Sequence, residues 1–210
     1  MAPSDFLIFL AASWLLILTP GPDMLYVLTR GAFQGKIPGL VSAAGVTLGI
    51  LVHTLSAALG LAVLLKTSNA AFMVVKLAGA AYLVFLGIQT FRRRPDRVAL
   101  SIQPRTRRSG TIFFQGMLTN VLNPKVALFF LAFLPQFTSE ASTLEPGLQM
   151  ALLGSVYALS TLIFLSALGY FSSRIHTWLQ HNTAPGRQIN RLTGSLFIGL
   201  GLCLALETPS

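Results

Sequence analysis

Six long apolar stretches, separated by short polar segments, follow one another along the chain. They lie at about 5–29, 39–65, 69–91, 111–134, 146–172 and 188–206. Each is close to the ~20 residues that a helix needs to cross the ~30 Å hydrocarbon core of a bilayer. The pattern predicts an all-α integral membrane protein with six transmembrane helices, which form one transmembrane domain over residues 1–210.

Proline motifs interrupt two of these predicted helices. The first is broken at Thr19-Pro20-Gly21-Pro22-Asp23 and the fourth at Asn123-Pro124-Lys125. Each break lies about 14 residues into its helix, or ~20 Å of helical rise, which is close to the membrane midplane. Unwound backbone at that depth is tolerated where it is buried in protein or lines a cavity. Two matched breaks, each beside a charge, favour a binding site, although structural kinks remain the alternative.

The two halves of the chain look related. "KLAGAAYLVFLG" at 76–87 aligns with "RLTGSLFIGLGL" at 191–202, as a basic residue, Leu, any residue, Gly and then an apolar run. Because each half holds three predicted spans, the second copy must be inverted relative to the first. The sequence therefore predicts two inverted three-helix repeats, at about 5–91 and 111–206, an arrangement that many secondary transporters use.

Composition agrees with a membrane protein. The chain is 53% hydrophobic and only 10% charged, with a mean hydropathy of +0.70, whereas soluble domains carry about 25% charged residues. Little sequence is left over for a soluble domain.

The basic residues of the chain are concentrated in one predicted loop. The net charge is +9, and the loop 92–110 between the two predicted repeats holds the densest group of arginines: Arg92, Arg93, Arg94, Arg97, Arg105, Arg107 and Arg108. By the positive-inside rule this loop is cytoplasmic, and so is the basic 29–38 loop, which places the N- and C-termini outside. Anionic lipid head groups are expected partners of Arg92–Arg108. Nucleic acid is not expected, since no aromatic residues are interleaved there.

Asp23 and Lys125 are the charges nearest the predicted midplane. An ionised side chain there costs at least ~2.5–3.5 kcal/mol, so both should face the bundle interior and have partners. Asp23 suits the start of a half-helix, whereas Lys125 meets the positive end of a helix dipole and needs an anion. That anion is either Asp23, in an ion pair that only fixes packing, or a substrate carboxylate. The candidate residues for substrate binding and coupling are Pro20, Gly21, Pro22, Asp23, Asn123, Pro124 and Lys125.

Four further polar residues are secondary candidates: Thr19, Asn120, His53 and Lys76. Asn120, like Asn123, could offer its amide to a ligand or satisfy freed backbone groups. His53 could relay protons, because its pKa is ordinarily near neutrality, or could simply form a packing hydrogen bond. Lys76 could snorkel to the membrane surface or contact substrate.

Other features limit the alternatives. Gly45 and Gly49 form a GxxxG pair, which indicates close helix packing or a homodimer face. Cys203 is the only cysteine, so neither an intramolecular disulfide nor a Cys-rich metal site is possible. No metal or cofactor is expected, and no enzyme either, since Asp23 has no companion carboxylate in the membrane and no Cys–His pair shares a predicted span.

Three motifs resemble the LysE/RhtB family of bacterial amino-acid exporters: Thr19-Pro20-Gly21-Pro22-Asp23, "KLAGAAYLVFLGIQT" at 76–90 and "NPKVALFFLAFLPQF" at 123–137. The resemblance covers essentially the whole chain. It implies a multi-pass inner-membrane exporter of amino acids or close derivatives, working as a proton-coupled antiporter by alternating access. A transporter of another small solute or cation, or a structural membrane subunit that transports nothing, remains open.

Overall fold

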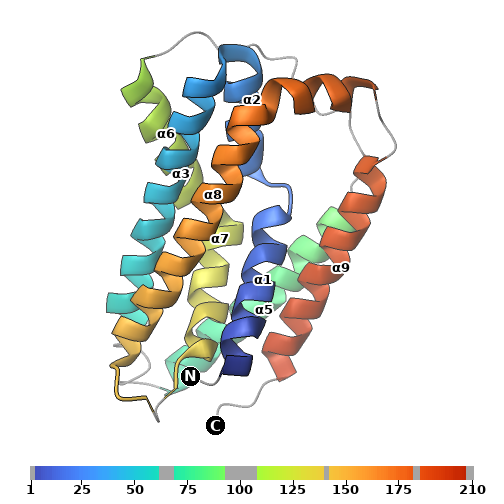
Figure 1. The fold of residues 1–210 in the computed structure, drawn as a ribbon. Coiled ribbons are helices and arrows are strands. Elements are labelled where there is room, and N and C mark those ends of the chain that lie inside the picture. The colour runs from blue at the N-terminus through green and yellow to red at the C-terminus, as the bar shows by residue number, and fades with distance from the viewer. Residues whose placement is uncertain (1–2, 62–68, 93–107, 140–141, 182–184, 207–210) are drawn as a thin grey trace.

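The computed structural model describes residues 3–61, 69–92, 108–139, 142–181 and 185–206, and the regular structure in them is entirely helical (Figure 1). Most of the predicted loop 92–110 lies outside these residues. The α-helices are α1 (Pro3–Leu18), α2 (Pro22–Gln34), α3 (Lys36–Ser56), α5 (Asn69–Arg92), α6 (Ser109–Val121), α7 (Pro124–Leu128), α8 (Pro146–His181) and α9 (Pro185–Leu206). Shorter helical turns are the π-helices η1 (Ala57–Leu61) and η2 (Phe129–Phe133) and the 3₁₀-helix η3 (Leu134–Phe137).

Several of these helices could cross a membrane. Judged by length and composition within the described residues, three do so singly, over Lys36–Gly60, Met73–Arg92 and Pro146–Arg174. Two bent pairs qualify if each is counted as one span, which makes five. Helix α9 occupies the sixth predicted stretch but is not among them, so the count of six stays a prediction. The chain is an integral membrane protein of the all-helical class.

The two bends occur at the proline motifs. Helices α1 and α2 meet at 53°, and the α6 helix meets the segment that begins with α7 at 49°. Pro22 and Pro124 each stand in the first turn of the helix that follows, where the missing N–H removes no helical hydrogen bond. The prolines therefore end one half-helix and allow a second to begin in a new direction.

The polar segment at 29–38, predicted as a loop, is almost wholly helical. Helix α2 continues to Gln34 and α3 begins at Lys36, so the only linking residue is Gly35, with φ 98°. A glycine adopts that left-handed conformation without the steric cost of a side chain. The prediction was wrong because a single glycine reverses the chain, and Arg30 consequently lies in a helix.

Glycines let the helices of the bundle approach closely. A Cβ atom at Gly45 of α3 would collide with the carbonyl oxygen of Phe113 in α6, and one at Gly49 would lie 2.7 Å from the Cβ atom of Asn120. Gly39 of α3 packs in the same way against Gly169 of α8. The GxxxG pair of α3 is thus occupied inside the chain, and these glycines do not form an exposed homodimer face.

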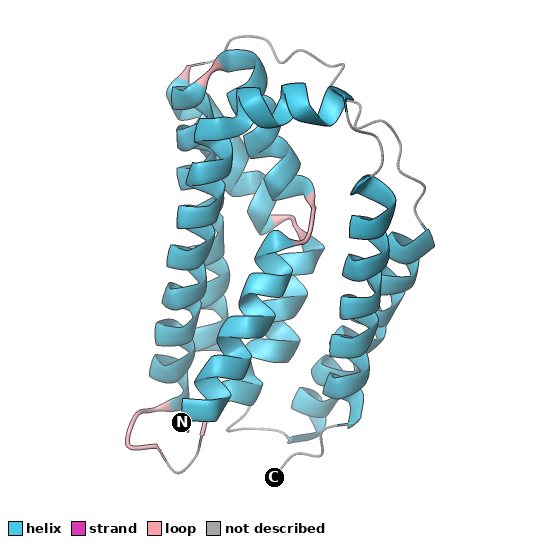
Figure 2. Cartoon of the chain, turned by 45° about the vertical axis from the view of Figure 1, so that its right-hand side comes forward, coloured by secondary structure: helices cyan, strands magenta, loops and turns pink. Residues whose placement is uncertain are grey.

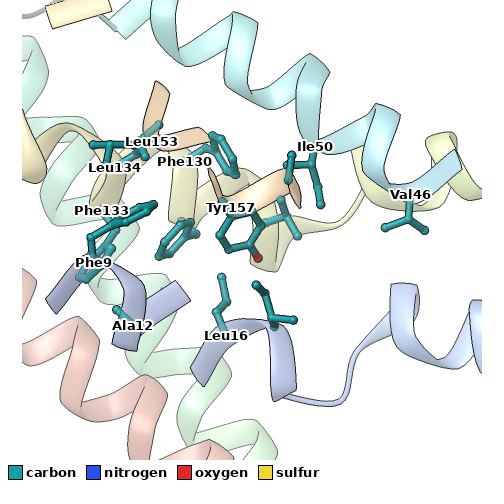
Figure 3. Close-up of a cluster of buried hydrophobic side chains, with 14 of the residues drawn as sticks. Phe9, Ala12, Leu16, Val46, Ile50, Phe130, Phe133, Leu134, Leu153 and Tyr157 are labelled. Carbon is teal, nitrogen blue, oxygen red and sulfur yellow. The ribbon is translucent and has the colours of Figure 1, made fainter. Parts of the chain in front are cut away.

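An aromatic cluster fills the core on the α1 side of the breaks. The Tyr157 ring of α8 has its centroid 5.0 Å from that of Phe129 and 5.4 Å from that of Phe130, both in η2. Phe9 of α1 joins them, 6.4 Å from Phe129. Figure 3 shows Tyr157 amid buried side chains from α1, α3 and η2. These large rings close the space beside the breaks.

Replacing Gly45 with Ala tests the glycine packing. We expect the variant to lose ~1–3 kcal/mol, because the added methyl group meets backbone that cannot rotate away. The measurement is the Tm of the detergent-purified protein. Gly199→Ala in α9 is the matched control, since its Cβ would meet open space, and it should keep or slightly raise the Tm. Equal Tm values for both variants would contradict the close approach.

Candidate functional site

The two breaks bring four half-helix ends together near the middle of the bundle. Figure 2 shows the loop segments at mid-height, with helices above and below. The main-chain groups at a helix end lack intrahelical partners. Here the end of α1 is closed by a side chain from the other half of the chain, and the start of α7 is capped by the residue that precedes it.

Asp23, in the first turn of α2, is held by the second break. Its Oδ2 atom accepts hydrogen bonds from Nδ2 of Asn120 at 2.8 Å and from Nδ2 of Asn123 at 2.9 Å. The Asp23 side chain is buried, with 8% of its surface exposed. Its other oxygen, Oδ1, is also buried and has no hydrogen-bond partner within the described residues. The carboxylate therefore has one bonded oxygen and one that could accept a donor.

Lys125, at the start of α7, reaches the first break. Its Nζ atom donates to the carbonyl oxygens of Leu16 at 3.1 Å and Thr19 at 3.0 Å. These carbonyls close the C-terminal end of α1, where the helix dipole favours a cation. The sequence left two possible anions for Lys125, the Asp23 carboxylate and a substrate carboxylate. Within the described residues Lys125 makes no direct ion pair with Asp23. The negative end of α1 supplies much of what that ammonium needs.

Gly21 makes room for this lysine. Its backbone is extended, with φ −159° and ψ −177°, and a Cβ atom there would lie 3.3 Å from Nζ of Lys125. A larger side chain would displace the ammonium from the end of α1.

The asparagines satisfy both the carboxylate and the backbone. Oδ1 of Asn123 accepts a hydrogen bond from the Lys125 N–H at 3.1 Å, so Asn123 is the N-cap of α7. The carbonyl oxygen of Asn120 lies 3.2 Å from Nε2 of His53. Because a carbonyl only accepts, Nε2 of His53 must carry the hydrogen in this contact. The sequence left two uses for these asparagines, binding a ligand or satisfying freed backbone groups, and both remain possible for the same residue.

The remaining predicted residues differ in position. Pro20, Pro22 and Pro124 are exposed, while Thr19 is buried and its hydroxyl donates to the carbonyl of Leu15. Lys76 is buried within α5, with 3% of its surface exposed, so it does not snorkel outward. Lys76 lies about two turns into α5, on the face that also buries Ala80 and Leu83, and this explains the difference.

Sequence reasoning missed Arg30. It falls in the basic 29–38 segment that was predicted to be a cytoplasmic loop, but it lies in α2 with 7% of its surface exposed. Asp23 and Arg30 are seven residues apart, which puts them on one face of a helix. The first predicted helix ended at residue 29. Had it been continued to residue 30, the seven-residue spacing would have placed Arg30 on the same helix face as Asp23.

Metal chemistry finds no support in the described part of the chain, where no three His, Cys, Asp or Glu side chains form a possible metal site. The charged groups at the breaks are instead held by amides and carbonyls. Such an arrangement can bind a small molecule that carries its own donor and its own anion.

Known proteins resemble the whole chain. The family model of the LysE type translocator matches residues 14–208. An uncharacterized membrane protein of Pseudomonas aeruginosa is 33% identical, with 99% of this chain and 97% of the relative covered. No solved structure matches.

Two further relatives have names that describe activities. The homoserine/homoserine lactone efflux protein of Salmonella typhimurium is 31% identical, with 94% of each chain covered. The leucine efflux protein of an Enterobacter species is 28% identical, with 96% of this chain and 95% of the relative covered.

Replacing Asn123 with Ala tests the link between the breaks. We expect a lower Tm, because the change removes the α7 cap, worth ~1 kcal/mol, and a donor to a buried carboxylate, worth ~1.5–3 kcal/mol. The control is Thr119→Ala, since within the described residues the Thr119 hydroxyl bonds to the Gln115 carbonyl of its own helix and to no other group. A Tm for Asn123→Ala equal to that of the control would show that the cross-link contributes no stability.

Proposed function

Because this chain belongs to the LysE type translocator family, we propose that it exports an amino acid or a close derivative across the bacterial inner membrane. Family membership makes it a transporter rather than an enzyme. The proposed binding site is the pair of breaks, and its central residues are Asp23 and Lys125. The whole of 1–210 acts as a single transport domain.

One observation carries this proposal. Asp23 keeps a buried Oδ1 atom without a hydrogen-bond partner in the described residues, and a buried acceptor of this kind is costly unless something donates to it. The ammonium group of an amino acid is a suitable donor. The substrate carboxylate would in turn accept hydrogen bonds from the Lys125 ammonium, in place of the carbonyls of Leu16 and Thr19. A zwitterion thus replaces bonds at both breaks.

The names of the relatives fit an ammonium-centred site. Homoserine and leucine are amino acids with uncharged side chains, and homoserine lactone keeps the amino group but has no free carboxylate. The group common to all three is the ammonium. We therefore assign ammonium recognition to Asp23 and expect a substrate with a small uncharged side chain.

Proton coupling follows from the same oxygen. A proton and a substrate ammonium cannot both occupy Oδ1 of Asp23, so binding of one releases the other, which is the requirement for antiport. His53 contacts the main-chain carbonyl of Asn120, and the side-chain amide of the same asparagine donates to Asp23. These contacts place His53 near the carboxylate, but the amide itself does not carry the proton. We propose that His53 relays the proton between Asp23 and the aqueous side.

Inverted repeats would supply alternating access. Helices α5 and α9 pack antiparallel, with Gly87 against Gly194 and Gly201 against Ala80. The alignment of 76–87 with 191–202 pairs Gly87 with Leu202 and Gly79 with Gly194. A two-fold axis would therefore turn the Gly87–Gly194 contact into a Gly79–Leu202 contact. The observed Ala80–Gly201 contact differs from this by one residue on each helix. This near coincidence supports a two-fold relation between the third helices of the two proposed repeats.

Orientation is proposed from charge. The loop that begins at Arg92 faces the cytoplasm and contacts anionic lipid head groups, and both termini lie outside. In Figure 1 the start of α1 and the end of α9 lie at the same end of the molecule, which suits two termini on one side.

The transport test uses everted membrane vesicles with an acid-inside pH gradient and radiolabelled homoserine, leucine and lysine. We expect gradient-dependent accumulation of homoserine or leucine. Asp23→Asn and Lys125→Ala should each lower the initial rate at least about tenfold, since each removes a charge-assisted bond to substrate. Lys36→Gln is the control, because Lys36 is an exposed cation whose ammonium lies over the Tyr170 ring. Undiminished accumulation by Asp23→Asn would refute the site.

The orientation test uses single cysteines in a Cys203→Ser background. Thr143→Cys, in the segment before α8, should react with a membrane-impermeant maleimide on intact cells. Ser109→Cys, at the start of α6, should react only after the cells are permeabilised. Both positions are exposed, so accessibility does not bias the comparison. The reverse labelling pattern would invert the proposed topology.

A further inference from the structure

Arg30 is a buried cation that the proposed site does not use. It lies in α2 with 7% of its surface exposed, and an arginine side chain stays protonated in proteins. A buried charge normally requires an opposite charge or a full set of hydrogen bonds. The surroundings of Arg30 therefore indicate what it is able to bind.

The described partners of Arg30 are all neutral. Its Nη1 atom donates to Oε1 of Gln34 at 3.1 Å, and its Nη2 atom donates to Oε1 of Gln115 at 2.8 Å. Its guanidinium carbon lies 5.3 Å from the centroid of the Tyr26 ring. Within the described residues no carboxylate pairs with this cation. The guanidinium group therefore donates to two amide oxygens, although its planar geometry would also suit a bidentate contact with one carboxylate.

Arg30 also lies on the same face of α2 as Asp23. The two residues are two turns apart on one face of α2, or about 10.5 Å along its axis. Both bond to α6: Asp23 through Asn120 and Arg30 through Gln115. Tyr26, which lies between them on α2, donates its hydroxyl to the carbonyl of Ile112 at 2.8 Å, and this hydroxyl is 3.5 Å from Oε1 of Gln115. The α2–α6 contact is therefore a polar seam that runs from the break toward the end of α2.

We propose that Arg30 binds the carboxylate of the exported molecule at a station within this seam, separate from Asp23 and ahead of it on the cytoplasmic side. The inference rests on the proposed export function. The substrate carboxylate replaces the amide oxygen of Gln115 on the guanidinium, exchanging a neutral acceptor for a charged one. The ammonium and carboxylate of one amino acid are too close together to reach Asp23 and Arg30 at once, so the substrate passes from one to the other.

The test compares substrates that differ only in the carboxylate. In everted vesicles, the half-saturating concentrations of leucine and of leucinamide are measured for the unaltered protein and for Arg30→Gln. We expect the value for leucine to rise about tenfold or more, the size of effect of one charge-assisted bond. The value for leucinamide should change less than twofold. Equal changes for the two substrates, or none, would overturn the proposal.

Gln115→Glu guards against a variant that fails to fold. The new carboxylate would pair with Arg30 and compete with the substrate, while the cation and its burial are kept. We expect the half-saturating concentration of leucine to rise and that of leucinamide to stay the same. Gln136→Glu is the matched control, because within the described residues the Gln136 amide in η3 donates to the Ala132 carbonyl in the adjoining η2, away from Arg30. An unchanged value for leucine in Gln115→Glu would refute a carboxylate station.

A second measurement separates this inference from the export function. The Tm of the purified protein is recorded with leucine and with leucinamide. If no substrate is transported but leucine raises the Tm only when Arg30 is present, the export proposal falls and the carboxylate station stands. If transport depends on Asp23 but the ratio of leucine to leucinamide does not depend on Arg30, only the station is lost. If neither transport nor an Arg30-dependent rise in Tm is observed, both proposals are refuted.

Discussion

The structure depends on one constraint: main-chain groups released by the two proline breaks must find partners where no water is available in a bilayer core. The C-terminal carbonyls of α1 are closed by the ammonium of Lys125, and the N–H of Lys125 itself is capped by Asn123. The carbonyl of Asn120 at the end of α6 meets His53. Lys125, Asn123 and His53 thus complete helix ends, whereas Asp23 bonds to the side-chain amides of Asn120 and Asn123.

These partners also connect the two halves of the chain. Lys125 follows the second break and binds the end of the first, while Asp23 follows the first and binds asparagines of the second. The two breaks therefore cannot separate without losing bonds to buried charged groups, which are costly to leave unpaired. Close glycine contacts between α3 and α6, and the aromatic cluster around Tyr157, fix the helices on either side.

Sequence patterns indicated the two breaks and the charges beside them, Asp23 and Lys125, because proline and intramembrane charge each have few structural explanations. They did not indicate how the charges are partnered. The ammonium of Lys125 bonds to carbonyls of α1, and a main-chain acceptor leaves no trace in the residue pattern. The position of Arg30 was missed for a different reason: a cation near a polar segment is typical of a loop, and only the one-residue link at Gly35 shows that the helix continues through it. The burial of Lys76 depends on which face of α5 packs inward, which its weakly amphipathic sequence does not reveal.

The cross-linking bonds give a reason why substrate would move the halves. In the proposed alternating access, separating the two breaks would cost the bonds of Asp23 to Asn120 and Asn123 and those of Lys125 to the carbonyls of Leu16 and Thr19. A zwitterion offers a donor to the carboxylate and an acceptor to the ammonium, so it replaces some of those bonds as they break. A ligand shifts a conformational equilibrium only through bonds that differ between the two states. Lys125 closes the end of α1 and is also a proposed substrate contact, so it would satisfy this condition directly, because it cannot do both fully at the same time.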